Sequence, residues 1–235
     1  MIKIKKIIKC IQNLRYIDLY FSGVSPLFEL ESHLKKIKKL STVIDIGSNK
    51  GQFLLISKKL FPKIKIFSFE PLIEELKIQK KILGTKNINY FNLALGNKKQ
   101  KFKINVLNRK DSSSILKPIS NPNLNLVIET SNEIKMDKLD NILNKCNISQ
   151  PSLIKIDVQG YELETLKGSN KILKKTNYII VEVSYIKTYE KQVMAKDLIR
   201  FLQKKGFSII YKSNINRING KIYQEDVLLK NKMFK

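Results

Sequence analysis

Hydrophobic residues along the chain form two kinds of pattern, short apolar runs and longer stretches with an apolar residue every three or four positions. The short runs have the length of buried strands, and the longer stretches have the spacing of amphipathic helices. From residue 42 onward the two kinds alternate, which is typical of a parallel sheet built from βαβ units. The runs predict strands at 42–46, 63–69, 88–93, 100–107, 131–136, 153–157, 178–183, 207–211 and 224–229. The stretches predict helices from the turn at 47–51 to about 61, and at 72–83, 139–144, 162–173 and 191–205.

The last two predicted strands are separated by a turn at Asn219 and Gly220. So short a connection can only join antiparallel neighbours. We therefore expect an α/β domain with a mostly parallel sheet and one antiparallel strand, covering residues 41–235. The polar stretch 108–132 contains Pro118 and Pro122 and predicts a long loop. Loops of that length in compact domains are usually functional, so we expect acceptor specificity there.

Residues 1–40 predict a helical extension to this domain. Stretch 26–40 has leucines and isoleucines at helical spacing, and residues 1–20 place five apolar side chains on one helical face with lysines on the other. Charges interrupt the apolar face too often for a signal peptide or a membrane span. The basic helix packs against the domain or lies on an anionic membrane surface, and the sequence favours packing.

The composition is strongly basic, with 45 Lys and Arg against 20 Asp and Glu, a net charge of +25. One interpretation is a polyanionic partner such as nucleic acid. The other is codon bias, because the chain is crowded with Lys, Ile and Asn and has only four arginines. Arginine supplies the bidentate contacts that phosphate recognition favours, so we favour bias and a partner other than nucleic acid. The sequence does not indicate an oligomeric state.

Cys10 and Cys146 are the only cysteines. Two distant thiols form neither a disulfide framework nor a zinc set. This usage suits a reducing compartment, and we expect a cytoplasmic protein that is at most peripheral at the membrane.

The first segment with chemical content is residues 43–53, VIDIGSNKGQF. A buried strand runs into a turn bounded by Gly47 and Gly51, where the missing Cβ atoms let a ligand approach the backbone. A dinucleotide site would need G-x-G-x-x-G, which is absent here. Asp45 beside the turn would repel a diphosphate but suits the ammonium group of an amino-acid-like ligand. We predict that Asp45, Gly47, Ser48, Asn49 and Gly51 bind S-adenosyl-L-methionine; a tight turn without a ligand is the alternative.

Glu70 ends the second strand, nineteen residues after Gly51. A carboxylate there can accept hydrogen bonds from both ribose hydroxyls of an adenosine moiety, each worth about 1.5–3 kcal/mol. Ala94 and Leu95 follow the third strand and could line the adenine, since the carboxyl ends of parallel strands border the ligand crevice. Ordinary strand ends are the alternative for these three residues.

The second segment is residues 153–168, LIKIDVQGYELETLKG. Asp157 ends a buried strand where substrates meet cofactors in this type of sheet. Gly160 permits a tight bend, and Glu162 begins the next helix, where the helix dipole favours its charge. Two carboxylates near one strand end favour catalysis, and helix capping is the alternative.

The segments VIDIGSNKGQF, FSFEP, NLALG, MDKLDNIL and IKIDVQGYELETLKG follow one another in this order. In this combination the chain resembles the FkbM family of methyltransferases, over about residues 42–229. The resemblance implies a class I Rossmann-like fold and an S-adenosylmethionine-dependent O-methyltransferase that acts on a hydroxyl of a glycan or small molecule. Family members commonly carry Glu where Gln159 stands, which leaves the role of this position open.

Methyl transfer to a hydroxyl is helped by a base that removes its proton. We hypothesise that Asp157, or Glu162 beside it, is this base. His33, the only histidine, is a weaker candidate, because it lies outside the resemblance on an apparently solvated helix position. We predict no metal; a divalent ion held by Asp157, Glu182 and another acid is the alternative.

Two other functions compete with this hypothesis. The net charge suggests an RNA or DNA methyltransferase, but the chain has no Asn-Pro-Pro-aromatic segment after the strand at 153–157 and no Pro-Cys pair for base chemistry. A non-enzymatic basic module that docks on an anionic surface would not bind S-adenosylmethionine at all.

Overall fold

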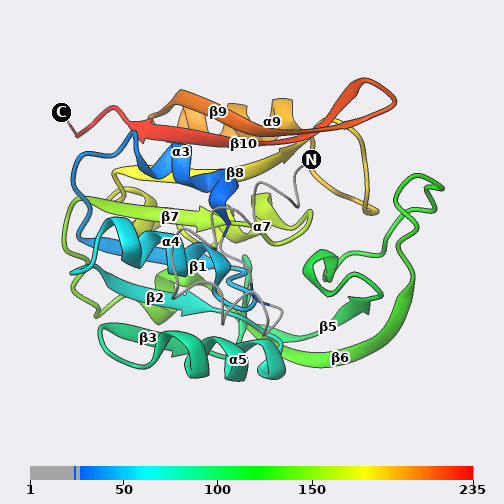
Figure 1. Cartoon of the computed structure of the whole chain (residues 1–235), viewed down its shortest axis with the longest axis horizontal. Helices are drawn as coiled ribbons and strands as arrows, with labels where there is room; N and C mark the ends of the chain where they lie inside the picture. Colours follow the sequence, from blue (N-terminus) through cyan, green and yellow to red (C-terminus); the bar gives the residue numbers. More distant parts are fainter. Residues whose placement is uncertain (1–23, 25–26, 235) are drawn as a thin grey trace.

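The computed structural model describes Val24 and residues 27–234. A seven-stranded sheet with the order β3-β2-β1-β7-β8-β10-β9 forms its centre (Figure 1). Its strands are β1 (Thr42–Ile46), β2 (Lys65–Phe69), β3 (Ile88–Phe91), β7 (Ser152–Ile156), β8 (Tyr178–Ser184), β9 (Phe207–Ile218) and β10 (Lys221–Asn231). All neighbours from β3 to β8 are parallel, and β10 runs antiparallel to both β8 and β9. The mostly parallel sheet with one antiparallel strand is confirmed.

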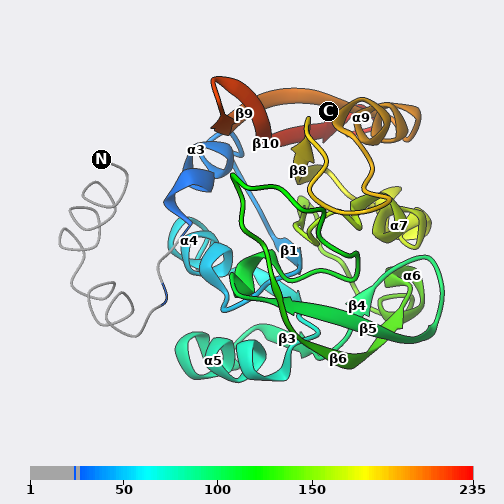
Figure 2. The ribbon, with the colours of Figure 1, turned by 90° about the vertical axis from the view of Figure 1, so that its right-hand side faces the viewer.

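Helices cover both faces of this sheet (Figure 2). The first face carries α3 (Glu31–Leu34), α4 (Gln52–Leu60) and α5 (Ile73–Leu83), and the second carries α6 (Leu139–Ile142), α7 (Glu162–Lys167) and α9 (Ala195–Lys204). Successive residues of β1 pack into different apolar clusters, Val43 with α3 and α4, and Ile44 with α7 and α9. Because side chains alternate across a strand, a strand buried on both faces reads as a continuous apolar run in the sequence.

A smaller sheet with the order β4-β6-β5 lies beside the central one. It contains β4 (Ala94–Leu95), β5 (Gln100–Leu107) and β6 (Ile128–Asp137). β6 is longer than the strand expected at 131–136, because its exposed first half pairs with β5 without any apolar alternation. The loop between β5 and β6, with a 3-10 turn η2 (Lys110–Ser112), crosses the carboxyl ends of the parallel strands (Figure 2).

Two of the predicted helices are divided into shorter elements. The helix expected at 26–40 is a short 3-10 turn η1 (Phe28–Leu30) followed by α3, although its apolar residues are buried against the sheet as expected. The helix expected at 162–173 is divided into α7 and α8 (Asn170–Leu173) at Gly168. A Cβ on Gly168 would lie 2.0 Å from the Gly96 carbonyl oxygen. The helix is therefore interrupted where Gly168 packs closely against the loop that contains Gly96.

The C-terminal part differs in length only. The helix expected at 191–205 begins at Ala195, and the two last strands extend to the turn at Asn219 and Gly220. Both turn residues have positive φ, 49° and 76°, as a two-residue hairpin requires.

The basic helix expected at residues 1–20, and with it the membrane alternative, lies outside the described residues. Within the described ranges, no helix combines the length and apolarity needed to cross a membrane.

Candidate active site

A cavity of about 300 Å³ opens at the carboxyl ends of β1, β2 and β7. Its size lies at the lower end of the range of small-molecule sites, about 300–1,000 Å³. The turn after β1, the end of β2, strand β4 and the loop after β7 form one part of its wall. The other part comes from the loop between β5 and β6 and from β8 and β10. Most residues singled out in the sequence therefore lie around one space.

The glycine turn after β1 is shaped by close backbone contacts. Gly47 has φ +75°, and a Cβ on it would lie 1.9 Å from the carbonyl oxygen of Asp157. Gly51 has φ +81°, and its Cβ would lie 2.8 Å from the Gln79 Cγ atom. The N–H groups of Gly47 and Ser48 both donate to the Phe69 carbonyl, at 3.0 and 3.1 Å. Glycine is thus required at both positions by conformation and by space.

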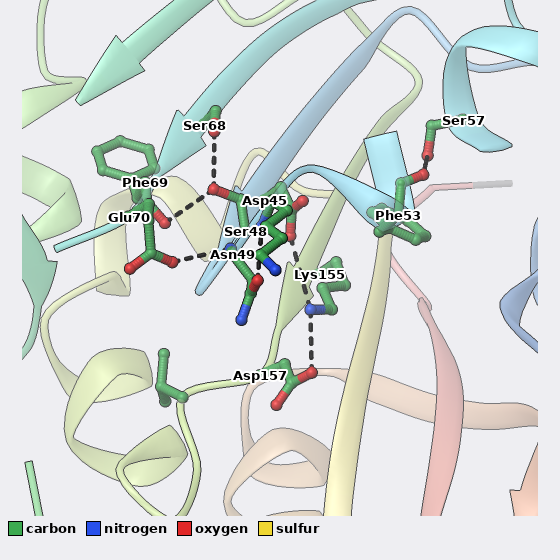
Figure 3. A network of polar contacts seen from close by, with 12 residues as sticks. Asp45, Ser48, Asn49, Phe53, Ser57, Ser68, Phe69, Glu70, Lys155 and Asp157 are labelled. Carbon is green, nitrogen blue, oxygen red and sulfur yellow. Dashed lines mark hydrogen bonds and ion pairs between the residues drawn. The ribbon is translucent and has the colours of Figure 1, made fainter. Parts of the chain in front are cut away.

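Buried polar side chains support this turn from behind. Ser48 Oγ lies 2.8 Å from Ser68 Oγ (Figure 3). The Gln79 amide, on α5, donates to Ser48 Oγ and to the Asn49 carbonyl, both at 2.9 Å. Gln79 is fully buried and was not predicted. The available signal was a polar residue at a position of α5 that faces the sheet.

Glu70 faces the cavity from the end of β2. Its Oε2 accepts a hydrogen bond from the Asn49 N–H at 2.8 Å (Figure 3). Its Oε1 accepts one from the Leu72 N–H at 2.9 Å. Burial raises the pKa of Glu70 to about 7, although these two bonds act in the opposite direction. Each carboxylate oxygen has a further lone pair, so both can still accept a bond from a ligand hydroxyl.

Ala94 and Leu95 form β4 and contribute an apolar part of the same wall. Phe69 lines the cavity between them and the glycine turn, and its ring stacks on Phe91 at 4.6 Å between centroids. Such a wall suits a flat, weakly polar group.

Asp45 differs from the other predicted residues in its position. Its side chain is fully buried, and it is not among the residues that line the cavity. Neither carboxylate oxygen has a hydrogen-bond partner among the described residues. The cation nearest to it is Lys155, whose Nζ lies 3.8 Å from Asp45 Oδ1. The ammonium group that the sequence led us to expect from a ligand is thus supplied by the protein itself.

Lys155 was missed in the sequence, although a lysine inside a buried strand is a visible signal. Its Nζ also contacts Asp157 Oδ2 at 3.2 Å (Figure 3). Burial disfavours its charge, but the carboxylates of Asp157 and Asp45 outweigh burial and raise the pKa of Lys155 above its ordinary value. Lys155 therefore carries a positive charge in the cavity wall.

Asp157 and Glu162, the two predicted catalytic carboxylates, have different surroundings. The Asp157 side chain is 30% exposed and lines the cavity. Glu162 is buried outside the cavity lining, and its Oε1 accepts the N–H groups of Val158 and Gly160 at 3.3 and 3.0 Å. Burial raises the pKa of Glu162 to about 7, against these backbone bonds. This geometry favours catalysis for Asp157 and the capping alternative for Glu162.

The loop between β5 and β6 is fastened to the segment after β7. Gln159 has φ +52°, and its carbonyl accepts the Ser114 hydroxyl at 2.6 Å. Its side-chain Oε1 lies 3.0 Å from the Tyr189 hydroxyl, whose single proton is shared between this oxygen and the Ser112 carbonyl at 2.6 Å. The loop predicted to decide specificity thus closes one side of the cavity.

Two further acids, Glu182 on β8 and Asp226 on β10, face each other across neighbouring strands and line the cavity. Gln224 donates to Glu182 Oε1 at 2.8 Å. Burial, together with Asp157 and Asp226, raises the pKa of Glu182 well above its ordinary value. Among the described residues, no group of three His, Cys, Asp or Glu side chains is arranged to hold a metal ion.

His33 is buried rather than solvated, which corrects the expectation for this residue. Its Nε2 lies 3.0 Å from the Asp226 carbonyl oxygen and its Nδ1 lies 3.2 Å from Ser213 Oγ. Its ring meets Tyr211 edge to face, with centroids 5.1 Å apart. Burial lowers the pKa of His33, against the Asp226 bond. His33 joins α3 to the sheet and is not part of the cavity lining.

Several known proteins are similar to this chain. A family model described as the methyltransferase FkbM domain matches residues 45–209. The 2-O-methyltransferase NoeI of Sinorhizobium fredii is 24% identical over 191 residues, which cover 75% of this chain and 79% of NoeI. The hexuronic acid methyltransferase AglP of Haloferax volcanii is 38% identical over 55 residues, only 23% of either chain. TrmK of M. capricolum, solved with S-adenosyl-homocysteine, has a TM-score of 0.51 at 14% identity, covering 87% of this chain and 68% of TrmK; this likeness concerns the fold.

Proposed function

Because the chain belongs to the FkbM methyltransferase family, we propose that it transfers a methyl group from S-adenosylmethionine to a hydroxyl of a glycan or small molecule. The observation that carries this proposal is the position of three features around one cavity: the glycine turn, the Glu70 carboxylate and the Asp157 carboxylate. The first two suit the two ends of the cofactor, and the third suits the acceptor.

The residues at the cofactor end fit S-adenosylmethionine. The turn residues Gly47, Ser48 and Asn49 line the cavity and can receive the methionine part. Glu70 keeps lone pairs for the two ribose hydroxyls. Ala94 and Leu95 offer an apolar surface to the adenine. When bound, the cofactor supplies an electrophilic methyl group on a sulfonium. Asp45 lies outside the cavity lining and contacts the lining residue Lys155.

Asp157 is placed to act as the base. Asp157 would take up the proton of the acceptor hydroxyl, while the bound cofactor would supply the methyl group. The step needs no further reactant. Holding the oxygen in line with the methyl group is the protein's main contribution, and the fastened loop also excludes water on that side.

The carboxyl groups at the acceptor end favour a polyhydroxyl group as acceptor. Asp157, Glu182 and Asp226 line this end with the buried cation Lys155 among them, and Arg109 and Lys110 of the loop between β5 and β6 also line the cavity. Carboxylates accept hydrogen bonds from sugar hydroxyls. The printed names of AglP and NoeI, a hexuronic acid methyltransferase and a 2-O-methyltransferase, point to the same class of acceptor. The net charge of +25 is the observation that supports a nucleic-acid acceptor instead.

One labelling experiment separates these acceptors. Methyl-tritiated S-adenosylmethionine is incubated with the protein and either total polysaccharide and glycolipid or total RNA. Label in the first fraction, lost in Asp157→Asn while cofactor binding remains, supports the proposal. Label only in RNA would replace it with the nucleic-acid function, and failure to bind the cofactor would refute both.

We further propose that residues 41–235 form one catalytic domain and that residues 1–40 extend it. The described part of the extension supports this division, because Phe28, Leu34 and Ile37 are buried in the same apolar cluster as Val43 of β1. Deletion of residues 1–23, followed by thermal unfolding and vesicle sedimentation, tests whether the preceding segment contributes to stability or to membrane binding.

A further inference from the structure

Asp157 is held by two donors, one on each carboxylate oxygen. Lys155 Nζ contacts Oδ2 at 3.2 Å, and Gln159 Nε2 donates to Oδ1 at 2.7 Å. Both donors lie two residues from Asp157 in the chain. The carboxylate is therefore fixed in rotation while 30% of its side chain stays accessible from the cavity.

Lys155 is shared between Asp157 and a second carboxylate. It is only 5% exposed and comes from the central strand β7, next to β1 with Asp45. Asp45 is completely buried and has no hydrogen-bond partner among the described residues, so the Lys155 charge is its main compensation. A buried charge without compensation costs several kcal/mol. The lysine is thus held in place by the carboxylate behind it.

The Gln159 side chain is held between Tyr189 and Asp157. The positive φ of Gln159 and Gly160 turns the backbone so that the side chain returns toward Asp157. Tyr189 faces the Gln159 Oε1 atom at 3.0 Å, which leaves the NH₂ group to point at Asp157. The orientation of this amide is therefore decided by its two partners.

Other charges around Asp157 are mostly negative. Glu162 lies on α7, Glu182 on β8, Asp226 on β10 and Asp45 on β1, and each interacts electrostatically with Asp157 or with Lys155. Like charges favour protonation of a carboxylate, whereas cations and donors favour ionisation. Four acids therefore lie around Asp157 and Lys155, whereas two donors, Lys155 and Gln159, contact the Asp157 carboxylate itself.

We propose that Lys155 and Gln159 are positioning residues that hold the Asp157 carboxylate aimed into the cavity, so that it can take up the acceptor's proton. The proposal rests on the methyltransferase function proposed above for this cavity. The proposal also gives Gln159 a role. Its amide donates a hydrogen bond to Asp157, whereas a glutamate at this position would place a second carboxylate against that of Asp157. A Gln159→Glu variant should therefore remove the donor to Asp157 Oδ1 and release the rotation of the Asp157 carboxylate.

The test follows the Asp157 carboxyl group itself and needs no acceptor. The full chain is labelled with aspartate carrying ¹³C at the side-chain carboxyl, titrated with pH by NMR, and the Asp157 signal is assigned with Asp157→Asn. The titration midpoint should rise by about one to three pH units in Lys155→Met, since an opposite charge at this distance is worth that much. It should rise in Gln159→Glu as well. Lys103→Met and Gln203→Glu, exposed and outside the cavity lining, are matched controls and should leave it unchanged.

Unchanged midpoints in folded Lys155→Met and Gln159→Glu would overturn the proposal. If Lys155→Met does not fold, Gln159→Glu decides, because its isosteric side chain leaves the buried Asp45 pair intact. Calorimetry with S-adenosylhomocysteine on the same samples keeps the two proposals apart. Wild-type protein that fails to bind it refutes the proposed function, whereas normal binding with unchanged midpoints refutes the role of the two donors alone.

Discussion

The backbone N–H of Asn49 donates a 2.8 Å hydrogen bond to Oε2 of Glu70, joining the glycine turn after β1 to the end of β2. The two residues are 21 positions apart and belong to separate sequence motifs. One bond therefore holds the two candidate cofactor-binding segments in a fixed relation, before any ligand is present.

Glu70→Ala should lower the affinity for S-adenosylmethionine by about 100-fold or more. The substitution removes an ionic acceptor for the ribose hydroxyls, worth about 1.5–3 kcal/mol per bond, and releases the Asn49 N–H. Isothermal titration calorimetry measures the change. Glu74→Gln is the matched control, because Glu74 lies on α5 and its side chain is 73% exposed. Equal affinities of the alanine variant and wild type would exclude Glu70 from the site.

Gly47→Ala should prevent cofactor binding and destabilise the fold by more than about 3 kcal/mol. Its Cβ would lie 1.9 Å from a backbone oxygen, which no side-chain movement relieves. Gly220→Ala is the comparison, because Gly220 has nearly the same φ, 76° against 75°, with nothing within 4 Å of its Cβ. Urea unfolding should show only the conformational cost there, about 1–2 kcal/mol. Equal losses in the two variants would mean that the close approach at Gly47 is unimportant.

Lys155→Met should lower the free energy of unfolding by about 3–5 kcal/mol, because it leaves the buried Asp45 carboxylate without its cation. Adding Asp45→Asn should restore part of this loss, since the uncompensated charge is then gone. A double-mutant cycle by denaturant unfolding measures the coupling. Additive losses would show that the two side chains do not stabilise each other.

Glu162→Gln should become more stable relative to wild type as the pH rises. Burial holds the pKa of Glu162 at about 7 in the folded protein, above its ordinary value of 4.5, so the folded state keeps a proton that the unfolded chain releases. Wild type therefore loses stability between about pH 4.5 and 7, by about 2–3 kcal/mol, and the glutamine variant lacks this loss. Chemical unfolding at pH 5 and pH 7.5 gives the difference, with Glu74→Gln as the exposed control. If the difference in unfolding free energy between Glu162→Gln and wild type does not change with pH, the pKa of Glu162 is not raised in the folded protein.

Hydrophobic periodicity predicted the central sheet because its strands are buried on both faces or paired with a buried neighbour. The pattern failed where burial does not dictate conformation. The first half of β6 is exposed and depends on pairing with β5, and Ile37 and Leu40 are buried without being helical. The division between α7 and α8 depends on the contact of Gly168 with a distant loop, which periodicity cannot contain.

The site was partly predictable for a similar reason. Gly47, Glu70 and Asp157 stand at the ends of predicted parallel strands, and the carboxyl ends of such strands meet at one edge. Lys155, Gln79 and Tyr189 act through partners on other elements, so only the fold shows what they contact. Asp45 has the negative charge that would suit a ligand's ammonium group. Because side chains alternate along β1, however, Asp45 faces Lys155 and does not line the cavity.

A crystal structure of the protein with S-adenosylhomocysteine tests the central claim most directly. The account predicts ribose hydroxyls on the Glu70 carboxylate, the amino-acid part along the turn at Gly47, and the sulfur facing the space beside Asp157. Ligand density in another place, or with the sulfur directed away from Asp157, would contradict it.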